Sequence, residues 1–178
     1  MLPIWFVFIA AGMRLLGGAS YVAAVIRGRA KPQPLSWLLW GITPLIAFFA
    51  ELSAGVGLRS VVTLALAITP LVVFTTIMIK NPRSLMLDRL NVTCLVIALC
   101  GIALWAITNR PLLAISVSIV ADIIASIPAF RKMLAQPRDE YVYTYMLSAV
   151  AMLLTLLTIS HWTPEAVAYP LYSFACNL

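Results

Sequence analysis

Polar side chains that could bind a solute lie inside long apolar stretches of this chain. In one stretch, Ser118, Asp122 and Ser126 are spaced four residues apart, which places them in one stripe along a helix. An ionisable residue within a membrane helix is energetically expensive, and it normally faces a bundle interior or a water-filled cavity. The stripe therefore predicts a polar site inside the protein, with Asp122 at its centre.

Other apolar stretches carry polar or aromatic residues at helical spacing. Residues three or four apart share a helix face, and this spacing relates Arg14 to Tyr21 through Gly18, and Tyr145 to Ser148. Each of these faces could line the same site as Asp122. The solute-binding residues predicted from the spacing are Arg14, Tyr21, Trp40, Ser118, Asp122, Ser126, Tyr145 and Ser148.

Several of these residues have alternative structural roles. Asp122 could form a structural ion pair with Arg14, or it could bind solute or protons. Burial disfavours the charged form of a carboxyl group and a nearby guanidinium favours it, so the sequence leaves the protonation of Asp122 open. Trp40 could stack on a sugar or, like Trp37, lie at the membrane interface. The serines could bond to their own helix backbone.

The elements that must position these residues are membrane-spanning helices. Hydrophobic residues make up 63% of the 178 residues and charged residues 10%, whereas soluble domains are about 25% charged. A helix needs about 20 apolar residues to cross the hydrocarbon core, and long continuous runs favour helices over strands. Seven crossings are predicted, the last of them short or truncated: residues 3–26, 35–54, 59–79, 90–108, 111–130, 141–160 and 162–178.

The basic residues predict an orientation. Most of the 12 Lys and Arg residues follow the first, third and fifth stretches, and cytoplasmic loops carry the excess of these residues. The N-terminus is therefore expected outside, as an uncleaved first helix, in a plasma membrane or a bacterial inner membrane. The same sorting explains the net charge of +6 without a nucleic acid. The residues expected in the cytoplasm are Arg27, Arg29, Lys31, Lys80, Arg83, Arg89, Arg131, Lys132 and Arg138.

Motifs for catalysis and metal binding are missing from the sequence. It has one His, no HExxH, no phosphate-binding loop and no GxSxG. Asp139 and Glu140 form a carboxylate pair, but acidic residues at a helix start stabilise the helix dipole. The three cysteines have no metal-ligand spacing. We therefore expect no enzyme activity, no metal and no cofactor.

The two halves of the chain are similar to each other. In each half, a helix leads to a basic turn, a proline after a polar residue, and an aromatic-rich helix start. The two prolines, Pro32 and Pro137, are 105 positions apart. The predicted plan is 3+1+3: a three-helix repeat in residues 1–80, a linker helix in 81–110, and a second, parallel three-helix repeat in 111–178.

One segment resembles a known family. Lys31-Pro32-Gln33-Pro34, followed by Ser36-Trp37, resembles the signature of PQ-loop proteins. The 3+1+3 plan is similar to that of SWEET-like (MtN3-type) sugar transporters and their half-size bacterial relatives. The second repeat departs from the pattern, because it has Gln136-Pro137 in reversed order.

The resemblance implies further roles. Prolines of the turns and helices would act as hinges for alternating access, and Asn177 would lie beside the solute, although the third stretch has no corresponding Asn. Pro128 should also bend its helix, since it lacks an N–H and clashes with the carbonyl four residues earlier. The predicted hinge residues are Pro32, Pro34, Pro44, Pro128 and Pro137.

The expected function is transport of a small polar solute, of the sugar or amino acid class, by alternating access. A receptor of the same fold that binds without transport is the alternative, as is a membrane assembly protein. The expected partners are the solute, protons if transport is coupled to them, the lipid bilayer, and optionally a second copy of the chain.

Overall fold

The computed structural model describes residues 1–82, 89, 92–93, 96–97, 100, 103, 107–108, 110–136 and 140–178. Within these ranges the chain forms helices and turns and no β-strand, which confirms the predicted all-α class. The elements are α1 (Phe6–Ile26), α2 (Pro34–Ser53), the short 3-10 helix η1 (Gly57–Arg59), α3 (Ser60–Lys80), α5 (Pro111–Ala135), α6 (Tyr143–Leu157) and α7 (Pro164–Cys176).

Within the described part of the chain, four helical segments are long and apolar enough to cross a membrane: α1, α2, η1 with α3, and α5. Helix α6 has 15 residues and α7 has 13, so both are shorter than the roughly 20 residues that a crossing needs. The predicted stretches 141–160 and 162–178 are therefore too long, because polar turns take up their ends. Four such helices are compatible with an integral membrane protein.

Prolines and glycines set several helix ends. Pro34, Pro111 and Pro164 lie in the first turns of α2, α5 and α7, where a missing N–H breaks no intrahelical bond. Gly55 and Gly57 have φ values of 76° and 71° in the turn between α2 and η1, a region that glycine adopts without steric cost.

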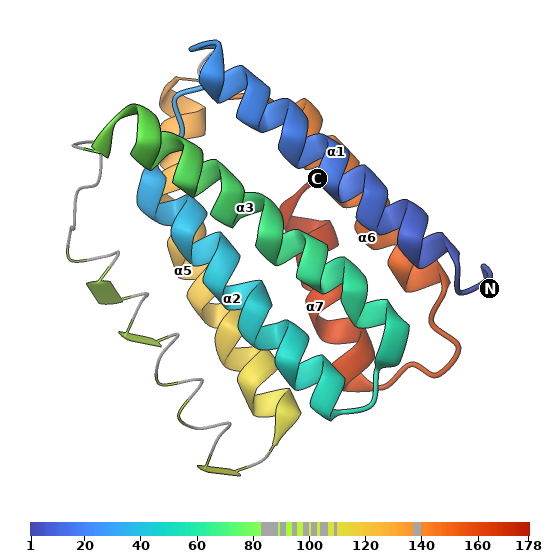
Figure 1. Ribbon diagram of the computed structural model, residues 1–178. Coiled ribbons are helices and arrows are strands. Elements are labelled where there is room, and N and C mark those ends of the chain that lie inside the picture. The colour runs from blue at the N-terminus through green and yellow to red at the C-terminus, as the bar shows by residue number, and fades with distance from the viewer. Residues whose placement is uncertain are drawn as a thin grey trace.

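The six α-helices named above form a closed ring (Figure 1). Going around it, α1 packs on α3, α3 on α2, α2 on α5, α5 on α7, α7 on α6, and α6 on α1. Helices α2 and α7 also touch across the ring, as do α3 and α6. The ring is therefore narrow, and residues far apart in the sequence face each other inside it.

Glycines allow some helices to approach closely. A Cβ atom at Gly18 of α1 would lie 2.2 Å from Cγ2 of Thr69 on α3, which is too close for any real side chain. At Gly41 of α2, the nearest atoms would belong to Leu71 of α3, at 2.5 Å. Small residues at these crossings let membrane helices gain packing contacts that lipid cannot supply.

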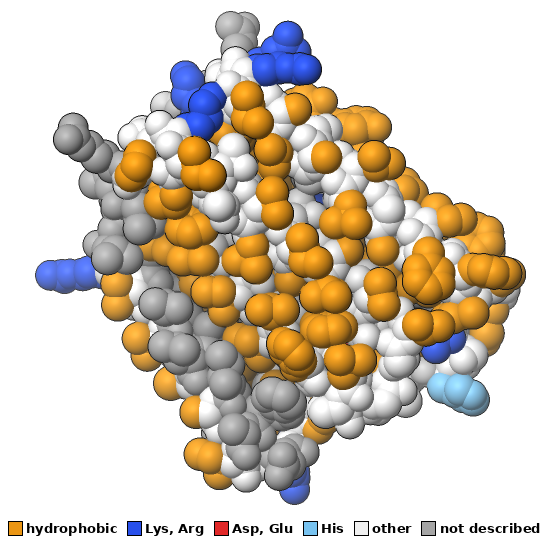
Figure 2. Space-filling model, viewed as in Figure 1, with side chains coloured by type: hydrophobic (Ala, Val, Ile, Leu, Met, Phe, Trp, Pro, Cys, Tyr) orange, Lys and Arg blue, Asp and Glu red, His pale blue; other side chains and the backbone are white. Residues whose placement is uncertain are grey.

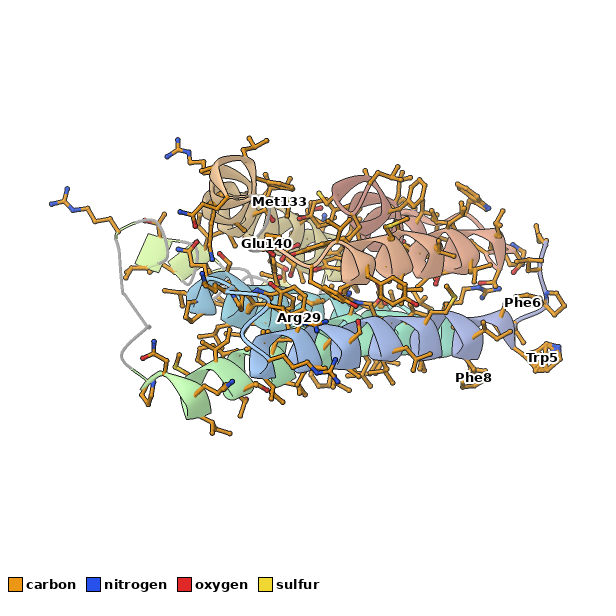
Figure 3. All side chains as sticks on the ribbon, turned by 90° about the horizontal axis from the view of Figure 1, so that it is seen from above. Trp5, Phe6, Phe8, Arg29, Met133 and Glu140 are labelled. Atoms are coloured by element: carbon orange, nitrogen blue, oxygen red, sulfur yellow. The ribbon has the colours of Figure 1, made fainter. Side chains whose placement is uncertain are left out.

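Most basic residues of the described chain lie at or beyond the end of the ring where α1, α3 and α5 finish, which we call the basic end. Figure 2 shows Lys and Arg side chains gathered there, and hydrophobic side chains over the face between the two ends. Arg29, Met133 and Glu140 lie toward the basic end, and Trp5, Phe6 and Phe8 lie at the other (Figure 3). At that other end, Nη2 of Arg59 donates to the carbonyl of Thr158 at 2.7 Å, which joins η1 to the residue that follows α6.

Helix α5 is longer than predicted. It continues to Ala135, beyond the expected end at residue 130, so Arg131 and Lys132 belong to the helix and not to a loop. Long basic side chains are good helix formers and favour the C-terminal turn, which explains the extension. The predicted linker crossing, residues 90–108, lies largely outside the described residues, as do Pro137 and the side chain of Pro128.

Candidate functional site: a cavity inside the helix ring

A cavity of about 290 Å³ lies inside the ring. All six of these helices line it, and its wall includes both mid-helix positions and exposed residues, such as Met146 in the first turn of α6 and Leu178 after the end of α7. Its polar and aromatic lining residues are Arg14, Trp37, Trp40, Asp122, Ser126, Phe130, Thr144, Tyr145, Tyr169, Tyr172, Ser173 and Asn177. This volume is near the lower end of small-molecule sites, which span roughly 300–1,000 Å³.

Two hydroxyl groups hold the carboxylate of Asp122. Thr43 of α2 donates to Oδ1, and Tyr172 of α7 donates to Oδ2 at 2.7 Å. Each oxygen thus has a donor from a different helix. A carboxylate that is half-buried among apolar helices is stabilised by such donors because it has lost part of its water. The side chain of Asp122 therefore ties α5 to both of its neighbours in the ring.

The guanidinium of Arg14 is much less well satisfied. Its Nη1 donates to the hydroxyl of Ser148 on α6, and its Nε is buried without a hydrogen-bond partner. The side chain is only 5% exposed, although it lines the cavity. Within the described ranges no ion pair joins Arg14 to Asp122, so the structural pair that the sequence suggested is not formed.

Aromatic side chains form the part of the wall near the basic end. Nε1 of Trp40 donates to the hydroxyl of Ser126 at 3.0 Å, which links α2 to α5. The rings of Trp40 and Trp37 are 5.5 Å apart, and Trp37 also packs on Tyr21 at 4.3 Å. Edge and face contacts of this kind fix ring orientation and contribute beyond simple burial. The result is a rigid indole surface beside Asp122.

Comparison with known proteins finds no matching family model, no similar curated protein and no similar solved structure. The site must therefore be interpreted from its own residues.

Most of the predicted solute-binding residues lie around this one cavity. Six of them line it: Arg14, Trp40, Asp122, Ser126, Tyr145 and Asn177. Asn177 directly follows α7, and its Nδ2 donates to the carbonyl of Ser173 at 2.7 Å.

The other three predicted residues lie outside the cavity wall. Ser148 is fully buried, and its hydroxyl accepts the hydrogen bond from Nη1 of Arg14. Ser118 is buried and its hydroxyl has no partner. Tyr21 is fully buried and donates to Oε2 of Glu140 at 3.0 Å, a carboxylate oxygen that Tyr145 also approaches at 3.4 Å.

The predicted hinge residues lie at helix starts and within helices. Pro32 precedes α2, Pro34 is its first residue, and Pro44 lies in its interior. The interiors of α3 and α7 also contain a proline each, Pro70 and Pro170, and Pro70 lines the cavity.

Sequence reasoning missed three residues that complete the site. Thr43 and Tyr172 are the donors to Asp122, and Tyr169 lines the cavity with its hydroxyl buried and unpartnered. A signal existed for two of them, because Tyr169, Tyr172 and Ser173 are three and four residues apart and so share a face of α7. Thr43 has no such signal, since a single hydroxyl in an apolar helix is common.

The opposite end of the ring is closed by buried contacts. Glu51 of α2 is 1% exposed and accepts a hydrogen bond from Thr63 of α3 at 3.1 Å. Helix packing therefore covers the side chain of Glu51. Taken with the Arg59–Thr158 contact, buried packing occupies this end of the ring, whereas the described residues that line the cavity lie at mid-helix positions and toward the basic end.

The site combines groups suited to binding. It offers a buried cation, a carboxylate, several hydroxyls and an indole surface, but the described residues contain no cluster of three His, Cys, Asp or Glu that could hold a metal ion. These groups can recognise a small solute that carries both polar and flat or apolar parts.

Proposed function

We propose that the protein is a multi-pass membrane transporter that moves a small polar solute, of the sugar or amino acid class, by alternating access. The proposed plan has seven helices, with two parallel triplets, α1–α3 and α5–α7, joined by a linker helix in residues 81–110. The observation that carries this proposal is the cavity between the two triplets, which holds Arg14 and Asp122 within apolar helices. Charged groups placed there are costly and are normally retained for a function.

The order of helices around the ring supports a repeat. The first triplet is arranged α1, α3, α2, and the second is arranged α5, α7, α6 in the same rotational sense. The main contacts between the triplets are α2 with α5 and α6 with α1, so each pairs the second helix of one triplet with the first helix of the other. Two units related in this way can rock against each other around a central site, which is a common plan for transporters.

Equivalent positions in the two triplets make equivalent contacts. Thr43 and Ser148 are separated by the same 105 positions as Pro32 and Pro137. Thr43 bonds a charged residue on the first helix of the other triplet, and so does Ser148. Trp40 and Tyr145 are also 105 positions apart, and both line the cavity. The charges bound by the two hydroxyls are opposite, which makes the two interfaces similar in position and different in chemistry.

The distribution of charge supports an inward-facing arrangement. The cavity wall extends toward the basic end, and basic loops are retained in the cytoplasm. Contacts such as Arg59 with Thr158 close the other end. In the proposed cycle these contacts break. At the same time, α2 moves toward α5 and α6 moves toward α1 at the basic end, which closes the cavity there. Pro44 and Pro70 interrupt the backbone ladders of α2 and α3, where bending would be least costly.

The test is solute uptake by the purified protein in liposomes. A panel of sugars and amino acids is offered with and without an inward proton gradient, and protein-free liposomes set the background. We expect saturable uptake of one solute class. Binding of a solute without any uptake would favour the receptor alternative, and neither binding nor uptake across the panel would contradict a solute-handling role.

A further inference from the structure

We infer that Arg14 is an anion site, and that the solute carries one carboxylate which binds its guanidinium. The inference is based on the hydrogen bonds of the Arg14 side chain. Nη1 is held by the neutral hydroxyl of Ser148, and Nε has no partner although the side chain is 5% exposed. A guanidinium presents a fixed fork of donors that matches a carboxylate. The donor set of Arg14 is therefore incomplete on a side chain that forms part of the cavity wall.

The charge of Arg14 has no counter-ion within ion-pair distance among the described residues. A buried cation paired with nothing more than a hydroxyl is strongly disfavoured in a membrane helix. Asp122 shares the cavity, but its two oxygens accept from Thr43 and Tyr172 instead. A bound carboxylate would supply the missing partner.

The same groups favour a solute with a single negative charge. One guanidinium can balance one carboxylate, whereas a second negative group would meet Asp122 on the facing side of the cavity. A phosphate dianion would meet that repulsion and find no second cation in the described lining. The apolar and aromatic wall, which includes Trp37, Trp40 and Phe130, suits a flat or apolar body attached to the carboxylate.

This inference rests on the proposed function, transport of a sugar or an amino acid. Carboxylate binding at Arg14 would favour an acid or amino acid over a sugar as the solute. The test uses the full chain, purified in detergent, and measures its thermal unfolding midpoint against ligand concentration. The probes share one carbon skeleton: phenylacetate, phenylacetamide and phenethylamine. We expect phenylacetate to bind about 10- to 100-fold more tightly than the amide, which is the range expected for a charge-assisted bidentate bond.

Variants assign the preference to Arg14. In Arg14→Gln the preference for phenylacetate over the amide should disappear, and in the matched control Arg29→Gln, an exposed arginine at the basic end, it should remain. Arg14→Lys keeps the charge without the fork and should keep part of the preference. If Arg14→Gln does not fold, the comparison of the three probes on the parent protein still decides the matter.

The outcomes distinguish the anion site at Arg14 from the proposed transport. Equal binding of acid and amide to the parent, or binding of phenylacetate to Arg14→Gln with unchanged affinity, would overturn the anion site. An unfolding midpoint of the parent protein that phenylacetate does not raise, up to the solubility limit of the probe, would also overturn the anion site. Sugar uptake without carboxylate binding would overturn the anion site and leave transport standing, whereas carboxylate binding without uptake of any solute would leave the anion site and contradict transport.

Discussion

Replacing Thr43 with valine removes a hydroxyl donor from the carboxylate of Asp122 at the contact between α2 and α5. Valine has nearly the same shape as threonine, so packing at this fully buried position changes little. A hydrogen bond to a charged partner contributes about 1.5–3 kcal/mol to stability. For a chain of this size, 1 kcal/mol corresponds to roughly 2–4 °C in the unfolding midpoint. We therefore expect Thr43→Val to lower the midpoint by about 3–12 °C.

A matched control separates the carboxylate from the rest of the effect. Thr43 also lies 3.0 Å from the carbonyl of Leu39 in its own helix. Thr155 of α6 is equally buried and donates to the carbonyl of Ala151 at 2.9 Å, with no hydrogen bond to a carboxylate among the described residues. Thr155→Val should therefore shift the midpoint by much less. The assay is thermal unfolding of both variants in the same detergent, followed by intrinsic tryptophan fluorescence.

The pH dependence of the Thr43 effect has a defined sign. When Asp122 is ionised, Thr43 donates to a carboxylate; when Asp122 is protonated, the bond is between neutral groups and contributes only about 0.5–1.5 kcal/mol. The difference between Thr43→Val and the parent should therefore grow as pH rises and Asp122 loses its proton. If Thr43→Val behaves like Thr155→Val at every pH, the account of how Asp122 is held is refuted.

Three further predictions concern coupling, packing and topology. Asp122→Asn should abolish pH-driven solute accumulation while sparing exchange at equal solute concentrations, and loss of both activities would point to a structural role instead. Gly18→Ala should lower stability by about 1–3 kcal/mol through overpacking against α3, whereas Gly12→Ala, where a Cβ meets open space, should raise it by up to about 1 kcal/mol; equal effects on thermal unfolding would contradict the close crossing. Single cysteines at Arg29 and Arg59 should label from opposite sides of sealed cells, and equal labelling of both from outside would refute the orientation.

The positions of the long helices could be predicted from the sequence, because apolar runs of this length rarely form anything other than membrane-spanning helices. The predicted stretches 35–54 and 59–79 differ from α2 and α3 by about one residue at each end. The end of α5 was harder to predict, because basic residues mark a membrane boundary and also extend a helix. The lengths of α6 and α7 were overestimated, since a sequence of mixed polarity near His161 fits either a helix end or a turn.

The site was only partly predictable, because helical spacing locates a stripe but not its partners. Residues four apart drift by about 40° around a helix of 3.6 residues per turn. Ser118 and Ser126 therefore face directions about 80° apart, and only Ser126 reaches the cavity. The two donors to Asp122 come from α2 and α7, which become its neighbours only through the order of helices in the ring. No local pattern encodes that order.

The central claim is that solute crosses the membrane through the cavity, and Cys176 allows a direct test. Cys176 lines the cavity, whereas Cys100 is exposed on the surface. One variant keeps only Cys176, and a control keeps only Cys100, with serine at the other cysteine positions. Both are reconstituted in liposomes, and uptake is measured before and after complete labelling with a bulky thiol reagent. The account predicts that labelling Cys176 reduces uptake to the level of protein-free liposomes and that labelling Cys100 leaves it unchanged. Full uptake with Cys176 completely labelled would contradict the account.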